Sequence, residues 1–460
     1  MVMTTLYQSF WSDIFGTTLL SPGKGGQLNG KACMSETEQR QNIMSLAAKE
    51  YRHNNFAQAE LLCRYLLSNY GGHVDALNLL GMVAMKVKRA DIAKRYFERA
   101  LVMQPRSSML IKNLTSANDL LRESEPASAD QDNGRIRYHV IKSWGCGFWS
   151  DVNQVLGHLL LAEITKRRPL VLWGSNSLFS ESTNDNAFEY FFDVASPVTL
   201  QDVTQAGQTY FPPKWNRENI TVNDINKWNG PYSRMAGLYY LNCTDTVTVG
   251  DFSALVTDLV GWLPKSHPMY GQSITKHYRH LFQRYLHPRA RYIHMANNFY
   301  LEHLSRYTSL AVHMRGSDKV FECSQLEAMN QAYPGHIDAF LRIYPDARIF
   351  LLTDSSTIHK KFCQRYHDHV VSSKCTRTED EQGVHFLPCA SRREIGGEVL
   401  IDALIAHQCD YFIGNGHSSV SNAIYHLKDW NTGSAKLLGG CRWYQSNLSL
   451  YDRGGEWSYN

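Results

Sequence analysis

The feature that most constrains this chain is an alternation, from Arg137 onwards, of short β-rich runs with longer helical stretches. The runs read IRYHVIKSW, PLVLW, SLAVHMR, ARIFLLTD, GVHFLP and CDYFIGN. Alternation of this kind predicts parallel sheets covered by helices, which is the doubly wound α/β class. The region holds roughly 300 residues, which is more than a single hydrophobic core usually accommodates. We therefore expect two Rossmann-type units.

A second periodicity precedes this region, at the roughly 34-residue spacing typical of tetratricopeptide repeats. One unit places residues at the packing positions of two antiparallel helices: Leu77, Leu80, Gly81, Ala84, Ala93, Phe97, Ala100 and Pro105. The preceding unit repeats the pattern weakly, and a capping helix is expected from Ser108 to Arg122. The segment therefore predicts an all-α module that binds a protein partner, mediates self-association or serves as a spacer packed on the rest of the chain.

A short polar segment marks the boundary between the helical repeats and the α/β region. Residues 123–135 read ESEPASADQDNGR, which is polar, has no large apolar residue and is typical of a linker. We therefore predict an unassigned segment (1–38), helical repeats (39–122), a linker (123–135), a first Rossmann-like domain (136–305), a second Rossmann-like domain (306–435) and a C-terminal tail (436–460).

Charge and hydropathy argue against several classes of protein. The formal net charge is +4 and the basic residues are scattered, so a nucleic-acid surface is not expected. No stretch reaches the roughly 18 apolar residues of a transmembrane helix, and the N-terminus lacks the pattern of a signal peptide. The ten cysteines include no C-x-x-C pair. We expect a cytoplasmic protein without a transmembrane segment.

The strand SLAVHMR ends in a dense polar cluster that holds His313, Arg315, Asp318, Lys319 and Glu322. Positive charge at the end of a parallel strand is costly to leave unpaired, so Arg315 and Lys319 are expected to meet an anion there. An alternative remains open in which Arg315 and Asp318 form an internal ion pair that fixes the loop.

Three other strand-to-helix turns are candidates for ligand binding, two of them in the same α/β unit as Arg315. ARIFLLTD ends at Thr353 and Asp354, and CDYFIGN leads into a turn where Ser418 or Ser419 can cap the next helix. The N-terminus of such a helix favours an anion, with plain helix capping as the alternative. In the first unit, Gly145 and Gly147 permit a tight turn after the strand, before a helix that Asp151 or Asn153 would begin.

These motifs together resemble those of the metal-independent fucosyltransferases. AVHMRGSDKVFE is similar to the HVRRTDKVGTE signature of α1,6-fucosyltransferases and nodulation fucosyltransferases, and LLTD is similar to their LATD strand end. Asp402 precedes Asp410 by that family's spacing, and Ser418 and Ser419 fall at the paired serines of its T-F-S-S-Q-V motif. NAFEYFFDVASP is a looser match to W-E-T-V-F-R-P-V-S. The similarity spans Arg137 to about Leu427.

The resemblance implies a GT-B pair of domains, with the acceptor on the first and the nucleotide sugar on the second. It implies an inverting hexosyltransferase that uses GDP-fucose as donor, needs no metal and no cofactor, and acts on a glycan hydroxyl. Carried over by position, His313 and Arg315 contact the diphosphate, and Asp318 and Lys319 shape the same site. Thr353 and Asp354 lie at its edge, Asp402 holds the guanosine or the fucose, and Ser418 and Ser419 hold the β-phosphate.

This sequence departs from the family pattern at two positions, one that carries a positive charge in the family and one that carries the general base. Gly316 replaces the second arginine of the R-R pair. The glutamate thought to be the general base aligns with Cys323 without a gap, so Glu322 takes that role through a one-residue shift, and Glu327 is the reserve candidate. Residues 198–266, aromatic and poorly periodic, are expected to form a loop that shapes the acceptor site.

Alternatives to this function stay open at the level of sequence. One is transfer of another nucleotide-linked sugar on the same fold, and the other is a tetratricopeptide adaptor with an inactive glycosyltransferase-like region. The only D-x-D sequence, Asp130 to Asp132, lies in the linker, which disfavours a metal-bridged diphosphate. His367, Asp368 and His369 are interpreted as solvated surface residues rather than metal ligands.

Overall fold

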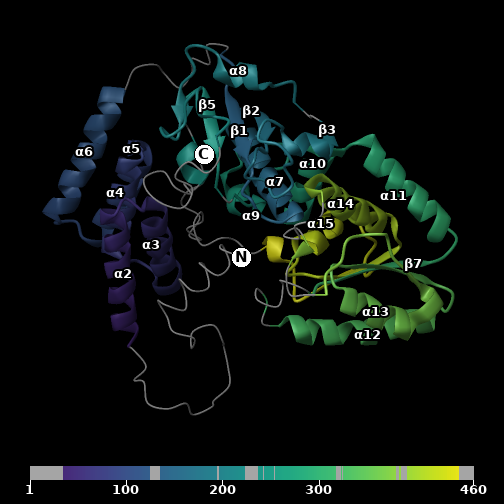
Figure 1. Ribbon diagram of the computed structural model, residues 1–460. Helices are drawn as coiled ribbons and strands as arrows, with labels where there is room; N and C mark the ends of the chain where they lie inside the picture. The colour runs from purple at the N-terminus through teal and green to yellow at the C-terminus, as the bar shows by residue number, and fades with distance from the viewer. Residues whose placement is uncertain are drawn as a thin grey trace. The chain divides into compact units, whose positions relative to one another are not determined.

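A computed structural model describes residues 35–124, 135–193, 196–222, 237–241, 243–252, 254–316, 323, 325–379, 383–384 and 391–444 (Figure 1). The chain divides into two compact units, Met1–Pro126 and Ala127–Asn460. No helix among the described residues is long and apolar enough to cross a membrane.

The first unit is a succession of helices in which each packs against the next: α2 (Glu36–Arg52), α3 (Phe56–Tyr70), α4 (Val74–Lys86), α5 (Ala90–Met103) and α6 (Ser108–Ser124). Close approach of α4 and α5 depends on Gly81, because a Cβ there would lie 2.3 Å from the Phe97 ring. Pro105 follows the end of α5, as the repeat pattern predicts. The helical hairpins are thus present, while their identity as tetratricopeptide repeats stays a prediction.

The second unit is mixed α/β. Its first half contains the following elements: β1 (Tyr138–Lys142), α7 (Phe148–Ile164), β2 (Arg168–Leu172), η1 (Ala187–Tyr190), β3 (Phe192–Asp193), α8 (Leu200–Thr204), β4 (Tyr210–Phe211), η2 (Gly237–Tyr240), β5 (Val247–Gly250), α9 (Val256–Leu259), η3 (Val260–Trp262), α10 (Ile274–Tyr285), β6 (His287–Pro288) and α11 (Ala290–His303).

Its second half continues with these elements: β7 (Ser309–Met314), α12 (Leu326–Ile343), β8 (Arg348–Thr353), α13 (Ser356–Tyr366), η5 (His367–His369), β9 (Val370–Val371), α14 (Arg392–Gln408), β10 (Tyr411–Asn415), α15 (Ser419–Leu427), β11 (Ala435–Leu438) and η7 (Arg442–Tyr444).

Two parallel sheets organise these elements, which confirms the predicted α/β class. The first has the strand order β2-β1-β5-β4 and the second β11-β10-β7-β8-β9. In β7, Leu310, Val312 and Met314 face the core formed with α12 and α13. Their neighbours point to the opposite face, where α14 and α15 lie (Figure 1).

Three expectations need correction. The segment 198–266 is not one loop, because β4 and β5 lie within it and β5 pairs with β1 over Tyr138–Ile141. The second domain does not end at 435, since β11 adds a strand through Leu438. Helix α7 begins at Phe148 with Gly147 as its N-cap, so Asp151 lies in the first turn rather than starting the helix.

Candidate functional site

The order of the second sheet places a crevice between two of its strands. From β7 the chain moves to β8 and then β9 on one side, and returns to add β10 and β11 on the other. Ligands of open α/β sheets bind at the carboxyl ends of the strands where the order reverses in this way. That point lies between the ends of β7 and β10, where the sequence places Arg315 and the turn before Ser418.

Arg315 is held at this edge by the neighbouring strand. Its Nη1 lies 3.1 Å from Oδ2 of Asp354, which follows β8, and the backbone N–H of Gly316 donates to Asp354 Oδ1 at 3.1 Å. Both side chains are mostly buried, and Thr353 beside Asp354 is buried. The described ion pair of Arg315 is therefore with Asp354, and the alternative partner Asp318 lies outside the described residues.

A close contact with the turn after β8 explains why position 316 is a glycine. A Cβ there would stand 2.8 Å from the Cβ of Ser355, in the turn after β8. A second arginine would require that turn to move, and the movement would shift the adjacent Asp354 that holds Arg315. The loss of one cation relative to the fucosyltransferase pattern is thus tied to the close approach of two strand ends.

The turn after β10 presents the N-terminus of α15 at the same edge. Gly416 allows the turn to form, because a Cβ there would collide with the carbonyl of Gly440. Ser418 is the N-cap residue, yet its side chain makes no capping hydrogen bond. The predicted alternative of plain capping by Ser418 is therefore wrong, and the first N–H groups of the helix are not satisfied by that hydroxyl.

His313 ties this helix to the sheet. Its Nδ1 lies 2.6 Å from the Ser421 hydroxyl of α15, and its backbone carbonyl accepts a hydrogen bond from Tyr333 at 2.7 Å. The imidazole is buried in β7. His313 thus fixes the position of the α15 N-terminus, and its predicted contact with a nucleotide stays a prediction.

Asp402 lies in α14 beneath the segment that follows β9. Its Oδ1 accepts a hydrogen bond from the Ser373 hydroxyl at 2.5 Å, and the backbone of Thr378 in the same segment donates to the carbonyl of Asp354 at 2.9 Å. Burial raises the pKa of the Asp402 carboxyl to about 6, while the Ser373 hydrogen bond acts in the opposite direction. One segment thus connects Asp402 to the strand end that holds Arg315.

The loop between β1 and α7 faces the same region from the first sheet. Asp151 closes this loop, because its carboxylate accepts from the Ser143 hydroxyl at 2.6 Å and from the backbone N–H of Cys146 at 3.0 Å. The hydroxyl of Ser150 lies 3.0 Å from that of Ser419. The N-terminal turns of α7 and α15 therefore meet, although they belong to different halves of the unit.

A buried charge pair at the end of β5 was missed by the sequence reasoning. Lys214 and Asp251 form an ion pair, and both side chains are less than one-tenth exposed. Lys142, at the end of β1, donates to the carbonyl of Ile220 at 2.6 Å and lies over the Trp215 ring. The available signal was the alternating run TVTVG before Asp251, which is typical of a strand.

Three predicted site residues, Asp318, Lys319 and Glu322, lie outside the described residues. Glu327, the reserve base, is exposed in the first turn of α12 and accepts a hydrogen bond from Gln331. Within the described ranges, no group of three or more His, Cys, Asp or Glu side chains is arranged to hold a metal ion.

Comparisons with known proteins gave structural similarity only. No protein-family model matches the chain, and no curated protein matches it in sequence. NodZ α1,6-fucosyltransferase co-crystallised with GDP is 19% identical over 63% of this chain and 92% of its own, with a TM-score of 0.42. Fucosyltransferase NodZ from Bradyrhizobium is 20% identical over 63% and 93%, with a TM-score of 0.43. POFUT1 in complex with GDP is 15% identical over 66% and 99%, with a TM-score of 0.42.

Proposed function

We propose that this chain is an inverting, metal-independent glycosyltransferase of GT-B type that transfers fucose from GDP-fucose to a hydroxyl of a glycan. The observation that carries the proposal is the position of Arg315, which follows β7 at the carboxyl edge of the second sheet, the same edge at which α15 begins after the neighbouring strand β10. A guanidinium and a helix N-terminus together form a site for a diphosphate.

The diphosphate fits this edge for electrostatic reasons. As the glycosidic bond breaks, negative charge develops on the β-phosphate, and an enzyme without a metal neutralises it with fixed cations and backbone N–H groups. Asp354 orients the guanidinium and offsets its charge in the unliganded protein. The additional positive charge is assigned to Lys319 and to the α15 dipole, with Ser418 and Ser419 donating to the phosphate.

The guanine base is assigned to the side of Asp402. An ionised carboxylate accepts hydrogen bonds from the ring N–H and the amino group of guanine, whereas the corresponding edge of uracil offers no such pair of donors. Asp402 is buried and is placed by the segment that contacts the turn after β8. This arrangement favours a guanosine diphosphate sugar over a uridine one.

The transfer itself needs one base. We assign that role to Glu322, with Glu327 in reserve. The base removes the proton from the acceptor hydroxyl, the hydroxyl oxygen forms a bond to the anomeric carbon, and the bond to the β-phosphate breaks, so GDP departs with the electron pair. Attack from the face opposite the phosphate inverts the anomeric centre.

Isothermal titration with GDP, GDP-fucose, GDP-mannose and UDP tests the donor, in buffer with and without EDTA. We expect binding of GDP and GDP-fucose, with no change on chelation, and slow release of fucose from the donor in a hydrolysis assay. Binding of UDP without GDP would refute the donor assignment. Loss of activity in EDTA with rescue by manganese would refute the metal-independent mechanism.

The helical unit is proposed to be a tetratricopeptide-type module that binds a protein partner or a second copy of the chain, and the protein is proposed to be cytoplasmic. A fragment that begins near Arg135 should keep GDP binding and lose that association, because the chain divides close to this point. An insoluble fragment would show instead that the helices form part of the catalytic core.

A further inference from the structure

A cavity of about 1310 Å³ lies along the outer edge of β2, the terminal strand of the first sheet. We call it the β2 groove. Its floor is apolar and includes Leu170, Leu172 and Phe188, and its polar rim comes mainly from the segments on either side of β3. The volume exceeds the roughly 300–1,000 Å³ usual for a single small ligand, so the groove has room for an extended one.

The outward edge of β2 is partly covered by an asparagine. The Asn186 side chain donates to the carbonyl of Val171 at 2.8 Å and accepts from the backbone N–H of Trp173 at 2.9 Å, so it occupies the hydrogen-bonding positions of a further strand. This contact disfavours pairing of a polypeptide strand with β2, which leaves the side chains of the groove to select its occupant.

Those side chains are suited to a neutral polyol. The rim contains hydroxyl and amide groups and two carboxylates, Asp185 and Glu189, and the described residues that line the groove include no lysine or arginine. Each carboxylate uses one oxygen internally: Asp185 Oδ2 accepts from Tyr190, and Glu189 Oε1 accepts from Asn186. The described surroundings of the groove thus disfavour a phosphate or another acid and leave acceptors for sugar hydroxyls.

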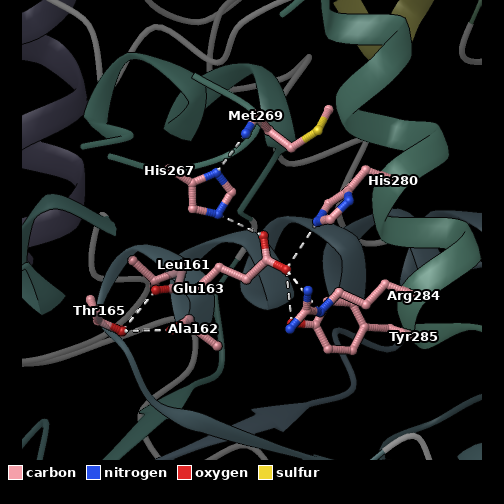
Figure 2. A network of polar contacts seen from close by, with 9 residues as sticks. All are labelled: Leu161, Ala162, Glu163, Thr165, His267, Met269, His280, Arg284 and Tyr285. Atoms are coloured by element: carbon pink, nitrogen blue, oxygen red, sulfur yellow. Dashed lines mark hydrogen bonds and ion pairs between the residues drawn. The ribbon is translucent and has the colours of Figure 1, made fainter. Parts of the chain in front are cut away.

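An aromatic ring at the groove is fixed in place. Tyr285 lines the cavity, and its hydroxyl donates to Glu163 Oε1 at 2.9 Å (Figure 2). The same carboxylate is contacted by His280, Arg284 and His267, at 3.2, 3.4 and 3.2 Å. Figure 2 shows these side chains converging on Glu163 from α10 and the preceding loop. A ring held in this way offers a rigid apolar face, against which the C–H face of a pyranose can pack.

The groove leads toward the β1 to α7 loop. Gly174 and Ser175 line it, and the next residue, Asn176, donates to the carbonyl of Ser143 at 2.5 Å. Ser143 in turn donates to Asp151 in the first turn of α7, the turn whose Ser150 contacts Ser419. A ligand that extends along β2 toward its carboxyl end therefore approaches the region where the donor is proposed to bind.

We infer that the β2 groove binds a neutral oligosaccharide of several rings, which is the acceptor of the proposed transfer, so the inference rests on the proposed function. The apolar floor and the fixed tyrosine contact the sugar faces, and the rim carboxylates and amides accept and donate hydrogen bonds to the hydroxyls.

An array of immobilised oligosaccharides, neutral and acidic, tests the inference with the labelled full-length chain. The blocking variant is Val222→Arg, because Val222 lines the groove and is 49% exposed, so the larger side chain enters the cavity without disturbing the core. The matched control is Ile343→Arg, at a position 69% exposed at the end of α12. Val222→Ile keeps an apolar side chain and should restore binding. Calorimetry with GDP is run on all four proteins.

The expected result is binding to neutral oligosaccharides that falls at least tenfold in Val222→Arg and is unchanged in Ile343→Arg and Val222→Ile, while GDP affinity is the same in all. Selection of acidic glycans, binding to no glycan, or equal binding by Val222→Arg would overturn the inference. If GDP binds and no glycan does, only the groove assignment fails. If neutral glycans bind at the groove and GDP does not, the proposed function fails and the groove remains a carbohydrate site.

Discussion

The carboxyl edges of the two sheets carry similar charged residues, but bury them to different extents. At the edge of the first sheet, Lys214 and Asp251 neutralise each other out of contact with solvent. At the edge of the second, Arg315 pairs with Asp354 and keeps 18% of its side chain exposed, and α15 begins at the same edge with an N-cap Ser418 whose side chain makes no capping hydrogen bond. The charged groups of the first edge are buried in an ion pair, whereas the guanidinium of the second edge is partly exposed at a crevice.

This difference predicts that the first edge contributes to the stability of the fold and the second to the binding of a ligand. A buried ion pair contributes mainly by avoiding an uncompensated charge, so removing one partner is costly to the fold. A partly exposed guanidinium, oriented by a carboxylate, can exchange or share that partner with an incoming phosphate. We therefore expect the first edge to govern unfolding and the second to govern the donor, and four experiments can break or sharpen this comparison.

The largest effect is expected for Lys214→Met. The substitution leaves the Asp251 carboxylate buried without its ion-pair partner, and the free energy of unfolding should fall by about 3–5 kcal/mol in urea denaturation. The double variant with Asp251→Asn should recover part of this loss. Lys360→Met, which removes an exposed pair with Glu379, should cause no measurable change. If folded Lys214→Met protein loses GDP binding, the two edges do not differ in function.

Arg315→Lys should lower GDP-fucose hydrolysis on the order of a hundredfold or more, or about 3 kcal/mol, because an ammonium cannot reproduce the planar fork of a guanidinium. The melting temperature should change little, since the positive charge beside Asp354 remains. Arg365→Lys is the matched control, because Arg365 pairs with Asp338 on the surface. A variant that is destabilised but fully active per folded molecule would make Arg315 a structural residue.

The buried histidines of the first half should make the protein less stable in acid. His139 Nε2 lies 3.1 Å from His158 Nδ1, and burial lowers the pKa of both rings, that of His158 to about 4. Because the unfolded chain takes up protons from about pH 6.5 downward and the folded chain does not, stability is present above that pH and is lost toward pH 4.

For His158 alone, the free energy of unfolding should fall by about 2 kcal/mol between about pH 6.5 and pH 5. His158→Gln should flatten this dependence in denaturation curves measured across the range, whereas His287→Gln, at an exposed position, should leave it unchanged. Equal slopes for all three proteins would show that the buried pair does not titrate in this window.

The smallest effect concerns Asp402 and the donor. Burial raises its pKa to about 6, so the carboxylate that would accept hydrogen bonds from guanine becomes protonated as the pH falls through that value. GDP affinity should fall about tenfold per pH unit below about pH 6, which is about 1.4 kcal/mol. Asp402→Asn should bind GDP weakly with no such dependence. A constant affinity between about pH 7 and pH 5 would separate Asp402 from the guanine site.

Much of the site could be predicted from local patterns. Hydrophobic runs that end in polar residues predicted where β7, β8 and β10 end. Because side chains at the carboxyl ends of parallel strands meet at one edge of a sheet, the same runs predicted that these polar residues lie close together. The partners could not be predicted in the same way. Arg315 was assigned a possible contact with Asp318, three positions away in the local cluster, whereas the described ion pair joins it to Asp354 at the end of the adjacent strand.

The sequence by itself determined the α/β class, the helical hairpins before it and the turns that carry the candidate donor site, because each depends on periodicity and on residues within one strand or helix. Only the tertiary structure decided that β5 lies between β1 and β4, that Lys214 meets Asp251, and that Ser150 meets Ser419. Those contacts join segments far apart in the chain, and their energies depend on burial and strand order, which no local pattern encodes.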